Sequence, residues 1–139
     1  MTSAVSVEAL LRRFYLDTSA AAKLLVQEPE SIPLAGWADG ANIGLVATHL
    51  LETELRRFAN RHGLPHANVS AILNRIDLHD LPPSLYREAG LLPGHALRPL
   101  DALHLAASIR LDVDALVTYD ARLARAAEEM GLQVHAPNA

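Results

Sequence analysis

The chain is organised around residues 97–108, which read Leu97-Arg98-Pro99-Leu100-Asp101-Ala102-Leu103-His104-Leu105-Ala106-Ala107-Ser108. Pro99 predicts that a helix begins here, because proline suits the first helical position, where its missing N–H is not needed. Asp101 then falls in the first turn, where the positive end of the helix dipole stabilises an ionised carboxylate. Helical spacing places Asp101, His104 and Ser108 on one face. The helix is therefore expected to have a polar edge at its N-terminal end.

A short strand that leads to an aspartate, followed by a helix, occurs twice in this chain. Apolar, β-prone residues precede Asp17 and, after the segment 97–108, precede Asp120. The alternation of strands with helices along the rest of the chain predicts an α/β fold, in which helices cover both faces of a mostly parallel central sheet. Sites in such folds lie at the carboxyl ends of the strands, so the two aspartates are expected at the same edge of the sheet.

The expected elements are short and closely spaced. Strands are expected at residues 14–16, 43–47, 77–81, 115–119 and 132–135, and helices at residues 20–26, 31–38, 65–76, 82–89 and 121–130, with two more that begin after Thr48 and at Pro99. Thr18 and Ser19 are expected to cap the helix at residues 20–26. Thr48 is expected to cap the helix that begins directly after it. Gly63 and Pro65 should interrupt that later helix.

Length and composition narrow the class of protein. A single domain is expected over residues 1–139, with residues 1–13 as a leader segment. Because the chain has no cysteine, a metal ion would be held by oxygen or imidazole. The net charge of −4, from 12 Lys+Arg against 16 Asp+Glu, argues against a broad basic surface for nucleic acid. Apolar runs are too short for a membrane span and no secretion signal is apparent, so we expect a cytoplasmic protein without a membrane partner.

Glu54 occupies an unusual place in its helix. The apolar stripe of this helix contains Leu50, Leu51, Leu55 and Phe58, and Glu54 lies inside the stripe rather than opposite it. An unpaired buried carboxylate is costly, so Glu54 should have a partner such as a metal ion, an arginine or a cluster of donors. Glu52, by contrast, is expected to pair with Arg56 on the exposed side, four residues further along the helix.

Four carboxylates are thus expected to converge on one cleft, namely Asp17, Glu54, Asp101 and Asp120. Mutual repulsion would raise their pKa values in the absence of a cation, and oxygen ligands favour Mg²⁺, with Mn²⁺ as a possible substitute. The hydroxyl groups of Thr18, Ser19 and Thr118 are candidates to orient water or a phosphate oxygen. His104 is expected to support this cluster near Asp101 rather than to act as an acid or base.

The segments around these four acids resemble the acidic motifs of PIN-domain ribonucleases, and most of all those of VapC-type toxins. The matching segments are Tyr15-Leu16-Asp17-Thr18-Ser19-Ala20, Thr48-His49-Leu50-Leu51-Glu52-Thr53-Glu54-Leu55, Leu97-Arg98-Pro99-Leu100-Asp101-Ala102-Leu103-His104-Leu105-Ala106 and Val117-Thr118-Tyr119-Asp120-Ala121-Arg122-Leu123. They occur in the family's order over residues 14–137, which is nearly the whole chain. Glu54, rather than Glu52, holds the motif's position before leucine.

This resemblance implies a fold, an activity and partners. The fold would be a three-layer α/β/α PIN-like sandwich. The activity would be Mg²⁺-dependent endonucleolytic cleavage of an RNA substrate such as tRNA or rRNA, inhibited by a cognate VapB-type antitoxin encoded beside the toxin. A homodimer or a toxin–antitoxin hetero-oligomer would be the expected assembly. By motif, Asp17 and Asp101 would be the principal metal ligands, and Glu54 and Asp120 would complete the acidic site.

Two other functions are compatible with the same residues. A non-catalytic PIN-like module could use its acids to bind an arginine-bearing partner, since a guanidinium can take the place of a cation between carboxylates. A nuclease acting on DNA is the other alternative, although the net negative charge does not favour it. Binding of divalent ions by the free protein distinguishes the first alternative, and competition between RNA and DNA distinguishes the second.

Overall fold

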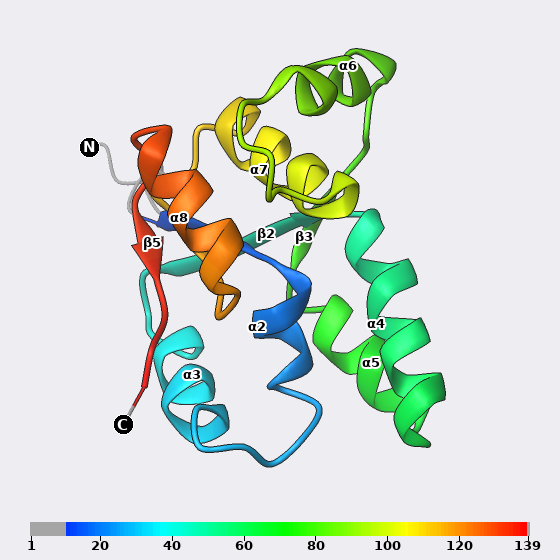
Figure 1. Ribbon diagram of the computed structural model, residues 1–139. Coiled ribbons are helices and arrows are strands. Elements are labelled where there is room, and N and C mark those ends of the chain that lie inside the picture. The colour runs from blue at the N-terminus through cyan, green and yellow to red at the C-terminus, as the bar shows by residue number, and fades with distance from the viewer. Residues whose placement is uncertain (1–10, 139) are drawn as a thin grey trace, which may run out of the picture.

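Five parallel strands form the centre of the molecule (Figure 1). A computed structural model describes residues 11–138 of the chain. The strands are β1 (Arg12–Leu16), β2 (Ile43–Thr48), β3 (Asp77–His79), β4 (Ala115–Val117) and β5 (Val134–His135). Their order across the sheet is β3-β2-β1-β4-β5, and every neighbouring pair is parallel. The prediction of a mostly parallel sheet is confirmed.

Helices cover both faces of this sheet. They are α2 (Thr18–Ala22), α3 (Ser31–Ala38), α4 (Leu50–His62), α5 (His66–Leu73), α6 (Pro83–Leu91), α7 (Pro99–Arg110) and α8 (Ala121–Glu129). In Figure 1, α6, α7 and α8 lie above the sheet, and α3, α4 and α5 lie below it. This confirms the expected three-layer α/β/α architecture. No helix in the described part of the chain has the length and apolar character needed to cross a bilayer.

The central strands are buried on both faces. Consecutive residues of β1, namely Phe14, Tyr15 and Leu16, are at most 4% exposed, although their side chains alternate between the two sides of the sheet. A strand covered on only one face would show alternating exposure instead. The buried sheet therefore fixes the position at which each strand ends. It also fixes the positions of the residues that follow β1 and β4.

The first strand begins earlier than the sequence pattern predicts. Arg12 and Arg13 belong to β1, and the backbone N–H of Arg13 donates to Asp114 at 2.8 Å. The side chain of Arg13 also donates to the Leu111 carbonyl at 2.6 Å. Charged residues can extend an edge of a buried strand when such partners exist, and hydropathy does not report this. The predicted leader thus includes two residues of the sheet, and its residues 1–10 lie outside the described residues.

Two of the expected helix caps are also wrong. Asp17 caps α2 by accepting a hydrogen bond from the Ala20 N–H, so Thr18 and Ser19 lie inside the helix, which ends at Ala22 rather than Val26. Thr48 is the last residue of β2 and is 1% exposed, and the cap position of α4 is taken by His49 without a side-chain hydrogen bond. The hydroxyl groups of Thr18 and Ser19 therefore do not cap α2 and can form hydrogen bonds with acidic side chains instead.

Candidate active site

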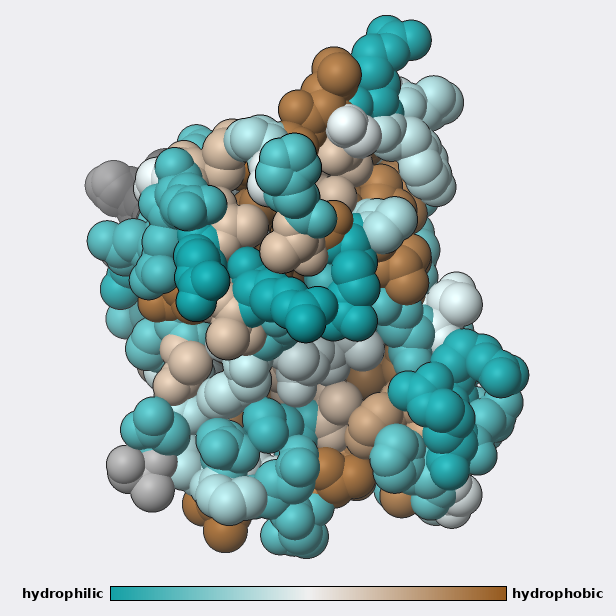
Figure 2. Space-filling model, in the orientation of Figure 1, coloured by the Kyte–Doolittle hydropathy of each residue, from teal (hydrophilic) through white to brown (hydrophobic). Residues whose placement is uncertain are grey.

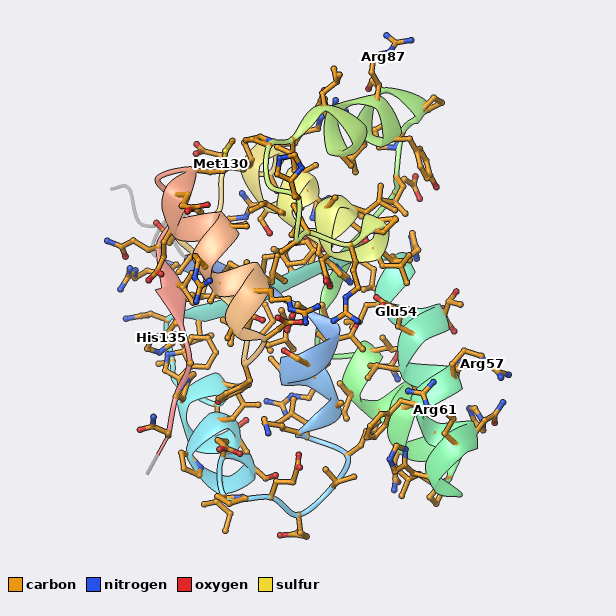
Figure 3. The ribbon with its side chains drawn as sticks, in the orientation of Figure 1. Glu54, Arg57, Arg61, Arg87, Met130 and His135 are labelled. Atoms are coloured by element: carbon orange, nitrogen blue, oxygen red, sulfur yellow. The ribbon has the colours of Figure 1, made fainter. Side chains whose placement is uncertain are left out.

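The four predicted acids lie at the carboxyl edge of the sheet. Asp17 directly follows β1, and Asp120 follows β4 and begins α8. Glu54 lies near the start of α4 and Asp101 lies in the first turn of α7. Figure 2 shows hydrophilic residues gathered across the middle of this face, between α2, α7 and α8. In Figure 3, Glu54 lies on the side of α4 that faces these elements, whereas Arg57 extends from its outer side.

Asp17 is held rigidly at the end of β1. Its side chain is 3% exposed. One carboxylate oxygen, Oδ1, accepts from the Ala20 N–H at 3.0 Å and from the Ser19 hydroxyl at 2.8 Å. The other oxygen, Oδ2, accepts from the Thr118 hydroxyl at 2.7 Å. Burial nevertheless raises the pKa of Asp17 above its ordinary value, because these neutral donors do not replace the lost hydration. A cation beside Asp17 would therefore be strongly stabilising.

The hydroxyl groups predicted to act in the site form a network around Asp17. Besides its bond to Asp17, Ser19 Oγ lies 3.2 Å from Thr118 Oγ1 and accepts from the Tyr119 N–H at 2.9 Å. Thr118 Oγ1 also accepts from the Asp120 N–H at 3.0 Å. These contacts join the end of β1 to the end of β4. In the structure, Ser19 and Thr118 thus hold acidic residues in place.

Glu54 has the partners that its position in the apolar stripe requires. Its Oε1 accepts from Thr18 Oγ1 at 2.7 Å and from His104 Nε2 at 2.6 Å. Burial raises the pKa of Glu54, but the hydrogen bonds from His104 and Thr18 outweigh this effect and leave the pKa below its ordinary value. Glu54 is therefore ionised at neutral pH. His104 directs this hydrogen bond to Glu54, and not to Asp101 as its helical position suggests.

Asp101 and Asp120 both lie near Arg98, a residue for which the sequence pattern predicts no role in the site. Arg98 Nε is 3.5 Å from Asp101 Oδ2, and Arg98 Nη2 is 3.8 Å from Asp120 Oδ2. Burial, and then the negative charge of Asp120, raise the pKa of Asp101. Arg98 precedes Asp101 by three residues, and this helical spacing is the signal that could have identified it.

Asp120 has a structural role as well as a place in the cluster. Its Oδ1 accepts from the backbone N–H groups of Arg122 and Leu123 at 2.9 and 3.2 Å, which caps α8. Its Oδ2 is the oxygen that lies nearest to Arg98. The two oxygens of one carboxylate are thus divided between the helix and the acidic cluster.

The donor set of this cluster fits a hard divalent cation. The four carboxylates lie on separate elements at the same edge of the sheet. Two of them, Asp17 and Asp101, have raised pKa values that a cation would relieve. Within residues 11–138, no group of three or more acidic or histidine side chains is already arranged as metal ligands. Glu54 is instead hydrogen-bonded to His104, and Asp101 and Asp120 lie near Arg98. Asp17 accepts hydrogen bonds from its neutral neighbours. Oxygen-only ligands favour Mg²⁺ or Mn²⁺ over softer ions.

Known proteins resemble this chain in both sequence and structure. Residues 14–129 match the family of PIN domains. Ribonuclease VapC35 of Mycobacterium tuberculosis is 40% identical over 131 residues, covering 88% of this chain and 96% of the relative. Ribonuclease VapC47 of the same species is 36% identical over 132 residues, covering 90% and 97%.

Solved structures share the fold at lower sequence identity. The crystal structure of VapC20 from Mycobacterium tuberculosis, described as a sarcin-ricin loop cleaving toxin, has a TM-score of 0.70 and 18% identity, and the match covers 89% of this chain and 99% of that one. VapBC2 of Rickettsia felis, bound to a DNA fragment from its promoter, has a TM-score of 0.69 and 14% identity, with coverage of 91% and 99%. These two likenesses concern the fold alone.

Proposed function

Because the chain belongs to the PIN-domain family and its relatives are VapC-type ribonucleases, we propose that it is an endoribonuclease that hydrolyses RNA phosphodiester bonds with the help of a divalent metal ion. Mg²⁺ is the proposed ion and Mn²⁺ its substitute. The proposal is supported by the position of four carboxylates along one sheet edge, with the pKa values of Asp17 and Asp101 raised. Structured RNA such as tRNA or rRNA is the proposed substrate, and the cytoplasm is the proposed location.

Each acid has a role that follows from its surroundings. Asp17 and Asp101 are proposed as the principal metal ligands, since a bound cation would offset the unfavourable burial of both charges. Glu54 and Asp120 would complete the site, each with one oxygen already held by the protein. A divalent ion bound there would lower the pKa of an attacking water and neutralise charge on the phosphate. Thr18, Ser19 and Thr118 would keep the carboxylates aligned during the reaction.

A protein antitoxin of the VapB type is the proposed partner. The structural relative from Rickettsia felis is VapBC2. The contacts of Arg98 with Asp101 and Asp120 support inhibition by an arginine, because a guanidinium already lies between two carboxylates of the cluster. A homodimer or a toxin–antitoxin hetero-oligomer is the proposed assembly. Adding the antitoxin should abolish RNA cleavage, and undiminished cleavage would contradict this part of the proposal.

The test of the activity is RNA cleavage by the purified protein in Mg²⁺ or Mn²⁺. We expect Asp17→Asn and Asp101→Asn each to reduce the rate by at least about 100-fold, the scale seen when one charge-stabilising group is removed from a transition state. The matched control is Glu52→Gln, because Glu52 lies on the same helix as Glu54 but pairs with Arg56 at 3.0 Å, away from the cluster.

Different outcomes separate the proposal from its alternatives. Wild-type cleavage by both aspartate variants, with circular dichroism showing that they are folded, would exclude catalysis by this cluster. A wild-type protein that binds no Mn²⁺ in calorimetry would favour a non-catalytic binding module. Preferential cleavage of DNA when DNA and RNA compete would favour the DNA nuclease. Sequencing the RNA ends produced in cells expressing the protein would identify the target.

A further inference from the structure

His104 is buried beneath the acidic cluster and joins it to the central sheet. It lies in the middle of α7 and is 2% exposed. Its Nε2 is 2.6 Å from Glu54 Oε1 and its Nδ1 is 2.7 Å from the hydroxyl oxygen of Tyr15 on β1. Both ring nitrogens are therefore engaged, one by an acid of the site and the other by a residue of the sheet. The proposed function assigns no task to this imidazole.

The contact with Tyr15 fixes the plane of the imidazole ring. Tyr15 is fully buried, and its ring meets that of His104 edge to face, with centroids 5.6 Å apart and an interplanar angle of 69°. The Tyr15 hydroxyl also lies 3.4 Å from Thr48 Oγ1 at the end of β2. Burial raises the pKa of Tyr15, so the hydroxyl keeps its proton at neutral pH. The ring is thus held by Tyr15 of β1, whose hydroxyl lies next to Thr48 of β2.

The hydrogen bond from His104 to Glu54 involves only one of the two carboxylate oxygens, Oε1. A carboxylate only accepts hydrogen bonds, so His104 Nε2 must carry the proton that is shared with Oε1. Thr18 Oγ1 donates to the same oxygen at 2.7 Å. Across the part of the chain that the structure describes, no residue donates a hydrogen bond to Oε2. Oε1 is therefore fixed from two sides, and Oε2 is left for a metal ion or its water.

We propose that His104 is a positioning residue, held by Tyr15, that orients the Glu54 carboxylate so that its second oxygen serves the metal site. This inference rests on the proposed function. It goes beyond that function in assigning a task to two buried residues, Tyr15 and His104, outside the four acids. Groups that orient a metal-binding side chain typically contribute about 10- to 100-fold in metal affinity or activity.

Two substitutions of His104 separate positioning from packing. His104→Gln places an amide N–H near the position of Nε2 and keeps the donor to Glu54. His104→Asn places its amide near the position of Nδ1, so it keeps a polar group beside Tyr15 and loses the donor to Glu54. We expect His104→Asn to weaken Mn²⁺ binding in calorimetry and to lower kcat by about 10- to 100-fold with little change in KM, and His104→Gln to restore most of both.

A double-mutant cycle and a matched control complete the test. In a Glu54→Gln background, His104→Asn should cause little further loss of Mn²⁺ affinity, because the group that it orients is already altered. Ser108→Ala is the control for general damage to α7, since Ser108 is fully buried but its hydroxyl donates only to the His104 carbonyl. This variant should leave Mn²⁺ affinity unchanged, because the hydroxyl that it removes contacts only the helix backbone.

The possible failures are distinguishable. His104→Asn with wild-type Mn²⁺ affinity and kcat would overturn the positioning role and leave the proposed ribonuclease intact, as would losses that add fully to those of Glu54→Gln. Equal losses in His104→Asn and His104→Gln would also overturn it, because they would show that only the shape of the imidazole matters. A wild-type protein that neither binds Mn²⁺ nor cuts RNA would overturn the proposed function and the positioning role together.

Discussion

Asp101 carries a negative charge that the folded protein holds unfavourably. Burial raises the pKa of Asp101, and the nearby charge of Asp120 raises it further. The folded state therefore binds a proton at Asp101 more readily than the unfolded chain does. This penalty on stability is absent below the unfolded pKa of about 3.9 and grows as pH rises through the folded pKa. At neutral pH, the ionised Asp101 should consequently lower the free energy of unfolding of the metal-free protein.

Asp101→Asn should therefore stabilise the protein while it lowers the proposed activity. In EDTA at pH 7, we expect its unfolding temperature to rise by about 2–4 °C, which for a domain of this size corresponds to roughly 1 kcal/mol. The gain should vanish near pH 4. Loss of the Arg98 contact should subtract little, because the Arg98 side chain is 65% exposed. Asp80→Asn is the control, since the Asp80 side chain is 95% exposed. A gain that is independent of pH would contradict the charge-repulsion explanation.

Individual residues also show where sequence reasoning succeeds and where it stops. Glu54 could be preferred to Glu52 because periodicity alone places one carboxylate in the apolar stripe, and the structure gives these residues the expected kinds of partner, His104 for Glu54 and Arg56 for Glu52. The partner of His104 could not be predicted, because it depends on how closely α4 and α7 approach across the sheet. The contact of Arg98 with Asp101 could have been predicted from their helical spacing. Its contact with Asp120 could not, because that contact joins two helices.

At the scale of elements, helix ends were predicted correctly where a glycine or a proline determines the backbone conformation. Gly63 ends α4 in the left-handed conformation, with φ of 64°, as its place before Pro65 suggests. Pro99 begins α7 as expected. The end of α2 was predicted four residues too late because its apolar residues continue beyond Ala22, and hydropathy does not distinguish a helix from the turn that follows it.

Gly63 offers a test of this element rule. Gly63→Ala should destabilise the protein by about 1 kcal/mol, because an L-residue is strained in the left-handed region and a Cβ there would meet no atom within 4 Å that could compensate. Gly63→Asn should cost less, since asparagine tolerates this conformation. Gly90→Ala is the opposite control. Gly90 is an exposed residue of α6 with open space around its Cβ position, so this change should stabilise by about 0.5–1 kcal/mol. Urea denaturation measures all three, and a neutral Gly63→Ala would refute the strain at the end of α4.

At the scale of the whole molecule, the order of the strands and helices along the chain was predictable. Each βα unit is recognisable in the sequence as an apolar run, followed by a polar residue and then by a helical pattern. The sheet order β3-β2-β1-β4-β5 follows from parallel crossovers that reverse direction once, after β3. This reversal sets β1 and β4 side by side, with Leu16 opposite Val117. Asp17 is thereby brought against Thr118, 101 residues away in sequence, at 2.7 Å. The site thus depends on topology more than on any single motif.

A cation bound at this shared edge should stabilise the entire fold, because its ligands come from four elements that separate on unfolding. Mn²⁺ at about 100 times its dissociation constant should add about 2.7 kcal/mol to the free energy of unfolding of the wild-type protein. The effect should be smaller at pH 5 than at pH 7.5, because the pKa values of Asp17 and Asp101 are raised and protons compete with the ion for both carboxylates. Thermal unfolding in a Mn²⁺ titration at each pH measures this. The Asp17→Asn, Asp101→Asn double variant should lose the Mn²⁺ effect while Glu52→Gln keeps it. An equal rise in both variants would mean that Mn²⁺ binds to surface acids and that the four carboxylates do not act as one site.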